Sequence, residues 1–266
     1  MKVVTHQSPD VDACICVWLM ETFKGYDKFG FLTEWGDAYV DCSPPTGAQP
    51  KEVYDQHFTE ENVPSSAELI YRTIKIDDEP KRKATEDIVR LANLQDQSIL
   101  PPDEFRAGYI STYLIGLQAI HRDDVRVMAD MLRFLNIILY ARIRYHVSVR
   151  EYERLEVHGE VRIGEYMVAY YDIPEGLFIN PAPYLFLDKG VDFCVYKMGN
   201  NIGILRNVDC KTYHLQRIQE FIDEPEWFFH KDGFLASRGT NKHPKSTPSK
   251  YSIQDILEIL KRALGG

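Results

Sequence analysis

The chain has 266 residues, of which 44% are hydrophobic and 27% charged, the balance of a globular protein with enough apolar material for a core. Its 31 Lys and Arg residues against 40 Asp and Glu residues give a formal net charge of −9, which excludes a generic basic nucleic-acid coat. The five cysteines are odd in number and scattered, which excludes a disulfide framework and a zinc ribbon. An acidic chain that binds a polyanion therefore needs a local cationic site.

The sequence carries no sign of secretion or of a membrane span. A histidine and two aspartates fall within its first twelve residues, where a signal peptide would be apolar or basic. The most apolar helical stretch, residues 134–143, is flanked by arginines and is about half as long as a bilayer span. We therefore expect a cytoplasmic protein with no membrane partner.

The first hundred residues alternate short apolar strands with helices. We expect strands at residues 2–5, 29–33, 38–41 and 53–54, and helices at residues 9–23 and 81–94. Pro9 is placed to start the first helix. Ser65 and Glu68 have the spacing of a capping box, which predicts the start of a further helix. The alternation predicts an α/β fold with an open, mostly parallel sheet.

The chain changes character after residues 101–102, both prolines. Residues 107–156 are compatible with helix almost throughout, and a β-rich pattern follows, with strands expected at residues 160–163, 166–171, 191–197 and 202–205. An amphipathic helix over residues 252–264 ends the chain. We expect an N-terminal α/β domain at residues 1–106, a helical connector at residues 107–156, and a smaller α+β domain at residues 157–266.

Side chains that bind metals stand where the predicted strands end. His6, Asp10 and Asp12 come where the first strand gives way to the first helix, which is where open α/β sheets bind ligands. An imidazole with two carboxylates offers the mixed nitrogen and oxygen ligands that hold Mn²⁺, Mg²⁺ or Zn²⁺. The alternative is that Asp10 only caps the helix and His6 is a polar residue at a strand end.

Further candidates follow in chain order: Asp41 at a strand end, Asp55-Gln56-His57 after the next strand, and Asp96 at the end of a helix. Any one of these aspartates alone could be a solvated loop residue, but their order is informative. The order resembles that of the DHH phosphoesterase superfamily, which includes family II inorganic pyrophosphatases, RecJ-like nucleases, oligoribonucleases and MYG-type exonucleases.

The resemblance implies a centre of two divalent ions, Mn²⁺ or Mg²⁺. It assigns a catalytic role to Asp12 and a phosphate contact to His57, and it gives the metal ligands as His6, Asp10, Asp12, Asp41 and Asp96. Gln56 stands where the family has the first histidine of its name. A glutamine carbonyl is neutral and a weaker ligand than an imidazole, so we expect Gln56 to bind one ion weakly. The sequence does not decide whether this second ion binds.

The C-terminal part adds candidates for substrate binding. Residues 201–206 resemble the family's strand that ends in a substrate-binding arginine, and residues 228–239 resemble its histidine motif, with phenylalanines in place of the leading glycines. The resemblance implies that Arg206, His230 and Arg238 supply the cationic site that the acidic chain needs. The alternatives are that Arg206 is a surface residue and that His230 is a packed histidine.

These features predict a hydrolase: a metal-dependent phosphoesterase acting on a nucleotide-type phosphoester. The substrate would be a short oligonucleotide, cut from its end, or a small phosphorylated nucleotide, and the nucleophile a metal-activated hydroxide. Two alternatives remain open. The first motif would also suit an inorganic pyrophosphatase or exopolyphosphatase, and Gln56 would suit a non-catalytic relative that binds a nucleotide or a metal. The long helices expected within residues 107–156 are compatible with pairing of two chains in a homodimer.

Overall fold

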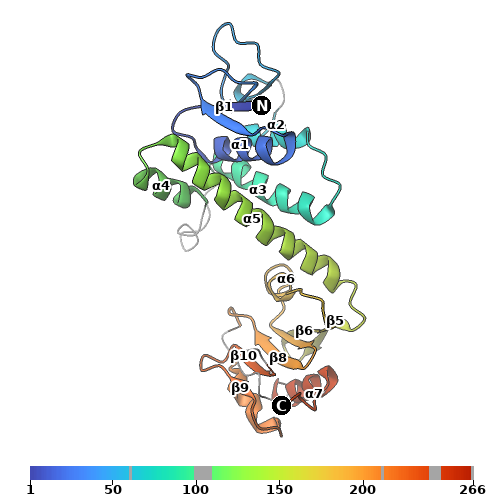
Figure 1. Cartoon of the computed structure of the whole chain (residues 1–266). Coiled ribbons are helices and arrows are strands. Elements are labelled where there is room, and N and C mark those ends of the chain that lie inside the picture. Colours follow the sequence, from blue (N-terminus) through green and yellow to red (C-terminus); the bar gives the residue numbers. More distant parts are fainter. Residues whose placement is uncertain (60–61, 99–109, 211–212, 240–246, 265–266) are drawn as a thin grey trace. The chain divides into compact units, whose positions relative to one another are not determined.

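The computed structural model describes residues 1–59, 62–98, 110–210, 213–239 and 247–264. The chain divides into two compact units, Met1–Ile143 and Arg144–Gly266, and each has its own sheet (Figure 1). The segment expected as a helical connector is shared between them. Helix α4 (Ile110–Ile120) and most of α5 (Asp124–Tyr152) belong to the first unit, and the end of α5 belongs to the second. The domain boundary expected at residues 106–107 lies outside the described residues.

The first unit is built on a parallel sheet of four strands in the order β2-β1-β3-β4. The strands are β1 (Lys2–Thr5), β2 (Lys28–Phe31), β3 (Ala38–Val40) and β4 (Glu52–Tyr54). The parallel α/β sheet predicted from the sequence is confirmed. Because the strand order reverses between β1 and β3, residues that follow these two strands meet where open α/β sheets bind their ligands.

Helices α1 to α5 lie below β1 in the view of Figure 1 and share one core with the sheet; α1 and α2 contact its strands, and α3 and α4 pack on α1. The first three are α1 (Val11–Lys24), α2 (Ser66–Arg72) and α3 (Glu79–Asp96). Their apolar sides form one core with the sheet, which includes Val3, Trp18 and Ile88. The opposite face of the sheet carries a smaller buried group of Val4, Tyr39 and Cys42.

Of two predicted helix starts, one is wrong and one is confirmed. Helix α1 begins after Pro9, and Asp10 is its N-cap, with a side chain that accepts the Ala13 N–H at 2.9 Å. The expected start at Pro9 is therefore wrong, because a carboxylate can satisfy a free N–H of the first turn and proline cannot. Ser65 caps α2 as predicted and accepts the Glu68 N–H at 3.2 Å.

The second unit contains a mixed sheet of six strands in the order β5-β6-β7-β8-β10-β9, in which β6 and β7 pair parallel and the other neighbours antiparallel. The strands are β5 (His158–Ile163), β6 (Tyr166–Ile173), β7 (Phe193–Met198), β8 (Asn201–Arg206), β9 (Phe228–Phe229) and β10 (Leu235–Arg238). Helix α7 (Ile253–Leu264) and the 3₁₀ helix η3 (Leu215–Phe221) pack on one face, and α6 (Ala182–Leu187) on the other. Within the described ranges, no helix combines the length and the apolar character needed to cross a bilayer.

Candidate metal centre

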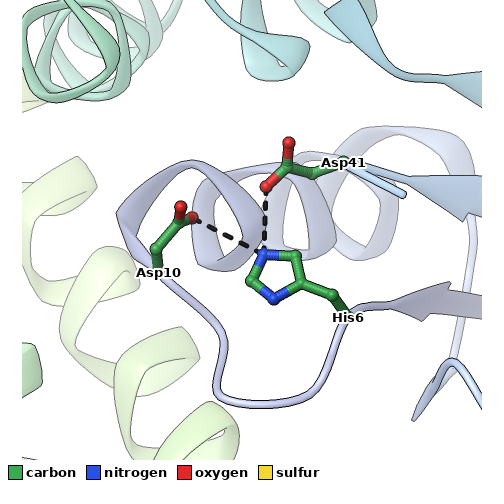
Figure 2. A group of neighbouring side chains, drawn as sticks. All are labelled: His6, Asp10 and Asp41. Atoms are coloured by element: carbon green, nitrogen blue, oxygen red, sulfur yellow. Dashed lines mark hydrogen bonds and ion pairs between the residues drawn. The ribbon is translucent and has the colours of Figure 1, made fainter. Parts of the chain in front are cut away.

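Three side chains that can bind a metal converge at the carboxyl edge of the parallel sheet, between β1 and β3. His6 follows β1, Asp10 caps α1 and Asp41 follows β3, and both carboxylates face the same imidazole nitrogen (Figure 2). Their ligand atoms all lie within 4.8 Å of one another, and in the described part of the chain no other set of three or more His, Cys, Asp or Glu side chains does this. The structure thus brings together three of the residues that the sequence marked as ligands.

The separations within this group suit a single divalent ion. His6 Nε2 lies 3.2 Å from Asp41 Oδ2 and 3.9 Å from Asp10 Oδ1. An ion with ligands at about 2.1 Å holds neighbouring ligand atoms about 3.0 Å apart and opposite ones about 4.2 Å apart. One nitrogen and two carboxylate oxygens at these distances therefore fit one ion of the size of Mg²⁺ or Mn²⁺.

Hydrogen bonding fixes the orientation of the His6 ring. Its Nδ1 lies 2.8 Å from the carbonyl oxygen of Gln7, which can only accept, so Nδ1 carries a proton and donates it. A metal-bound histidine commonly has this second contact, which leaves Nε2 to meet the ion. When no ion is bound, the hydrogen bond to Asp41 raises the pKa of His6 to about 9, so that a proton balances the nearby carboxylates.

The backbone turns sharply at Asp41 to place its carboxylate. Asp41 has a φ of 51°, a left-handed conformation that Asp adopts more readily than most residues. Its N–H donates to the Tyr54 carbonyl at 2.8 Å, and its Oδ1 accepts the Ser66 hydroxyl at 3.3 Å. The side chain is only 9% exposed, so Asp41 is held between β4 and the start of α2 and faces His6.

Asp12 lies deeper, fully buried at the start of α1. Its two oxygens accept the N–H groups of Ser66 at 2.8 Å and Ala67 at 3.0 Å, and the Cys16 thiol lies 3.7 Å away. Burial raises the pKa of Asp12 well above its usual range, and the negative charges of Asp41 and Asp96 raise it further. Asp12 therefore links α1 to the first residues of α2 and is not one of the group of three.

Asp96 and Gln56 approach the group from the side of β4. Asp96 ends α3, and its Oδ2 accepts a hydrogen bond from Gln56 Nε2 at 2.9 Å. Gln56 Oε1 accepts the hydroxyl of Ser66, which also receives the Gln56 N–H at 3.2 Å. Burial raises the pKa of Asp96 to about 6, as do Asp10 and Asp41, while His57 opposes the rise.

His57 and Asp55 belong to the 3₁₀ helix η1 (Gln56–Phe58) and its N-cap. Asp55 is buried and accepts the His57 N–H at 3.0 Å. The His57 side chain is exposed, and its Nε2 lies 3.2 Å from Gln56 Nε2. His57 thus presents an imidazole to solvent next to the Gln56–Asp96 pair.

The loop between His6 and Asp10 is tied to the helices that follow much later in the chain. The Ser8 N–H donates to Asp124 at 2.9 Å, and the Gln118 side chain donates to the Pro9 carbonyl at 3.1 Å. Ser8, like Asp41, has a φ of 51°. The turn between α4 and α5 therefore holds the loop that carries two of the three ligands.

An open pocket of about 780 Å³ borders the ends of β3 and β4. Asp55 and Phe58 line it together with Pro44, Leu69 and other residues of β4 and α2. Phe58 follows His57 directly in the chain, and its side chain is 77% exposed. The pocket thus offers an aromatic ring and a carboxylate within three residues of the expected phosphate contact.

The two arginines expected to bind substrate are enclosed within the second unit. Arg206 is 9% exposed, and its guanidinium donates to the carbonyls of Cys210, Asp232 and Gly233. The alternative of a surface arginine is wrong for Arg206, because these three carbonyls surround it.

Arg238 is 4% exposed; it donates to the carbonyls of Pro225 and Thr247 and lies 3.8 Å from the Glu224 carboxylate. Both arginines thus fasten loops in the second unit, whereas the group of three ligands belongs to the first.

His230 is half-buried against aromatic rings. Its ring centroid lies 4.1 Å from that of Phe234, and its Nδ1 accepts the Asp232 N–H at 3.2 Å. These contacts suit the packed histidine given above as the alternative. A role for His230, Arg206 or Arg238 in substrate binding stays a prediction.

Three residues around the centre were not marked by the sequence: Ser66, Gln118 and Asp124. Ser66 lies inside the predicted capping box, but the box gave no sign that its hydroxyl would meet Asp41 and Gln56. Ser8 and Asp124 are 116 residues apart, and no local pattern connects them. Only the tertiary packing that brings the start of α5 to this loop could have revealed the contact.

No family model matches the sequence, and no curated protein was found to match it. Among solved structures, the chain is similar to a pGpG-specific phosphodiesterase from Vibrio cholerae, with 14% identity, a TM-score of 0.37, and coverage of 99% of this chain and 97% of that one. A candidate family II inorganic pyrophosphatase from Methanococcus jannaschii is 13% identical with a TM-score of 0.27, and each chain is covered completely. RecJ from Thermus thermophilus, solved with Mg²⁺, is 10% identical with a TM-score of 0.34, over 99% of this chain and 49% of that one.

Family II pyrophosphatases and RecJ-like nucleases are two of the groups that the sequence resembles. At these identities and TM-scores, what the centre binds and does has to follow from this chain's own side chains.

Proposed function

We propose that the chain is a metal-dependent phosphoesterase of the DHH type that hydrolyses a nucleotide-type phosphoester. The observation that carries this proposal is the group of His6, Asp10 and Asp41, whose ligand atoms lie within 4.8 Å of one another where the strand order reverses. A nitrogen and two carboxylates favour Mn²⁺ or Mg²⁺ as the ion. Such a cation assists reaction at a phosphodiester, because it offsets the repulsion between an anionic nucleophile and the phosphoryl oxygens.

The residues around the centre have distinct tasks in this proposal. When bound, the ion would lower the pKa of a water molecule and thereby supply hydroxide near neutral pH. His6, Asp10 and Asp41 hold the ion, and the Gln7 carbonyl keeps the His6 ring in the orientation that presents Nε2. His57, exposed beside Asp96, donates to a phosphoryl oxygen. Asp12 keeps α1 and α2 together beneath the centre.

The pocket beside η1 favours a nucleotide over pyrophosphate. Phe58 presents an exposed aromatic ring next to His57, and Asp55 and Leu69 line the same pocket of about 780 Å³. A nucleobase stacks on such a ring, and each stacked base contributes about 1–3 kcal/mol to binding. Pyrophosphate has no apolar part that could use the pocket. A short oligonucleotide or a small phosphorylated nucleotide is therefore the substrate class that we favour.

The test is one assay with three substrates: bis-p-nitrophenyl phosphate, a dinucleotide and pyrophosphate, each with Mn²⁺ and with a chelator. We expect Mn²⁺-dependent hydrolysis of the two phosphodiesters, with the dinucleotide the better substrate and pyrophosphate the poorest. A preference for pyrophosphate would favour the pyrophosphatase alternative. Tight Mn²⁺ binding without hydrolysis of any substrate would favour a non-catalytic metal-binding protein.

Replacing the aromatic ring tests the substrate class separately. Phe58→Ala should raise KM for the dinucleotide about 10-fold, because one stacked base is lost, and should leave kcat for bis-p-nitrophenyl phosphate within about 2-fold. Phe178→Ala is the matched control, since Phe178 is 83% exposed and belongs to the second unit. An unchanged KM for the dinucleotide in Phe58→Ala would rule out the pocket as a base-binding site.

A further inference from the structure

The residues expected to hold a second ion are already engaged with hydrogen-bond donors. The resemblance implied two ions, and the group of His6, Asp10 and Asp41 accounts for one. The other expected ligands are Asp12, Asp96 and Gln56. Their contacts show whether a second cation fits among them.

The oxygens of Asp12 are directed at protein N–H groups. Oδ2 accepts the Ser66 N–H at 2.8 Å, and Oδ1 accepts the Ala67 N–H at 3.0 Å. Asp12 is 0% exposed, and the Cys16 thiol lies beside Oδ1 at 3.7 Å. Two backbone donors and one thiol therefore already meet the two oxygens of this buried side chain.

Gln56 faces Asp96 with hydrogens rather than with a lone pair. Its Nε2 donates to Asp96 Oδ2 at 2.9 Å, and its Oε1 accepts the Ser66 hydroxyl. An imidazole at this position would offer a lone pair to an ion, whereas an amide NH₂ offers two hydrogens, which repel a cation. The amide therefore meets Asp96 as a neutral hydrogen-bond donor, in the place where the family has a metal-binding imidazole.

Turning the Gln56 amide over would cost hydrogen bonds of the present network. The flipped Gln56 would set Oε1 against the Asp96 carboxylate, and two acceptors 2.9 Å apart repel each other unless a cation lies between them. The Ser66 hydroxyl, which also receives the Gln56 N–H, would lose Gln56 Oε1 as an acceptor and keep only Asp41 Oδ1 at 3.3 Å. The network of Gln56, Ser66, Asp41 and Asp96 thus favours one orientation of the amide.

We infer that this centre holds one divalent ion, at His6, Asp10 and Asp41, and that the Gln56 amide takes the place of a second. The inference rests on the proposed function for the first ion and departs from the two-ion centre that the resemblance implied. With one ion, further positive charge or hydrogen bonding on the phosphoryl oxygens comes from protein groups such as His57.

The test counts Mn²⁺ ions on the full-length protein by calorimetric titration and by metal analysis after gel filtration, with electron paramagnetic resonance as a second readout. The wild type should bind one ion and give the spectrum of an isolated Mn²⁺. Gln56→His should bind two ions and give the signal of an exchange-coupled pair. Gln97→His is the matched control, because Gln97 is exposed just past Asp96, and it should bind one ion.

Each outcome has a separate meaning. Two coupled ions in the wild type would overturn the inference and leave the proposed function intact, whereas no bound ion would contradict the proposed function itself. One ion in a folded Gln56→His would overturn the role given to the amide. Should Gln56→His not fold, Gln56→Glu replaces the NH₂ by an oxygen ligand of the same shape. It should also bind two ions, and one ion there would overturn the inference.

Discussion

At the scale of single residues, Asp10 combines two tasks. Its carboxylate caps α1 through the Ala13 N–H at 2.9 Å and also lies 3.9 Å from His6 Nε2. The two interpretations that the sequence left open, cap and ligand, are therefore compatible. Because asparagine caps a helix about as well as aspartate but carries no charge, substitution can separate the two tasks.

Asp10→Asn should weaken Mn²⁺ binding by at least about 100-fold, because a charged ligand is lost, and should unfold in urea like the metal-free wild type. Asp10→Ala should lose Mn²⁺ binding to the same degree and about 1 kcal/mol of unfolding free energy as well, since the cap is also lost. Calorimetry and urea titration measure the two effects. Unchanged Mn²⁺ affinity in Asp10→Asn would show that Asp10 is not a ligand.

The surroundings of Glu224 predict that the free energy of unfolding of the second unit depends on pH. Burial alone would raise the pKa of Glu224, but the Lys250 N–H at 2.6 Å, the Trp227 indole at 3.0 Å and the Ser249 hydroxyl at 2.7 Å outweigh it, together with Arg238. The pKa of Glu224 therefore lies below its usual value. A carboxyl with a lowered pKa stabilises the fold above its unfolded pKa of about 4.3, and this contribution is lost as the pH falls through the folded value.

Glu224→Gln should thus reduce the free energy of unfolding by about 1–3 kcal/mol at neutral pH, where the carboxylate meets all its donors. The difference from the wild type should stay constant down to about pH 5 and shrink below about pH 4. Urea unfolding at several pH values measures it, with the exposed Glu220→Gln as the control. A difference that grows as the pH falls would contradict the assignment.

The centre shows which residues a sequence can predict and which it cannot. His6, Asp10 and Asp41 were predictable because each stands next to the end of a strand or the start of a helix, and the ends of parallel strands meet at one edge. The hydrogen-bonding role of Gln56 was not predictable, because it depends on the Ser66 hydroxyl and on the end of α3. Burial of the two arginines was hidden for a similar reason, since the carbonyls that bind them lie in loops.

At the scale of elements, the turn between α4 and α5 supports the loop of residues 7–9. The Ser8 N–H donates to Asp124 at 2.9 Å, and Gln118 donates to the Pro9 carbonyl at 3.1 Å. Asp124→Ala should therefore lower Mn²⁺ affinity about 10-fold, because the loop that positions His6 and Asp10 is less restrained. Asp123→Ala is the control, since Asp123 bonds the Val125 N–H within the same turn. Equal Mn²⁺ affinities in the two variants would contradict a positioning role for Asp124.

Gly36 lies where the segment before β3 passes close to β1, on the face of the first sheet that carries the smaller buried group of Val4, Tyr39 and Cys42. A Cβ at Gly36 would lie 2.5 Å from Val4 Cγ2 and 3.2 Å from the Lys2 carbonyl oxygen. Gly36→Ala should destabilise the protein by about 1–3 kcal/mol, because the crossing segment has to move away from the buried strand β1. Gly116→Ala, in α4 with open space around its Cβ, should instead be neutral or stabilise by up to about 1 kcal/mol. Thermal unfolding measures both changes in stability, and equal changes in Gly36→Ala and Gly116→Ala would contradict this account.

At the scale of the whole molecule, sequence patterns predicted the first unit better than the second. The first unit alternates short apolar strands with helices, and this predicted alternation matches the observed parallel sheet. In the second unit, β9 (Phe228–Phe229) and α6 (Ala182–Leu187) are too short to establish a period, so they were missed. The division at Ile143 falls inside α5, where no change of composition announces it. A homodimer stays a prediction.

The most direct test of the central claim is to titrate Mn²⁺ while following both binding and hydrolysis of bis-p-nitrophenyl phosphate. The wild type should reach half-maximal activity at the Mn²⁺ concentration that half-saturates binding. Asp41→Asn should lose at least about 100-fold in both, because the side chain between His6 and Ser66 no longer carries charge. Asp77→Asn, at an exposed ion pair with Lys75, should match the wild type. Hydrolysis that survives the chelator, or wild-type Mn²⁺ binding and activity in Asp41→Asn, would contradict a metal-dependent phosphoesterase centred on this group.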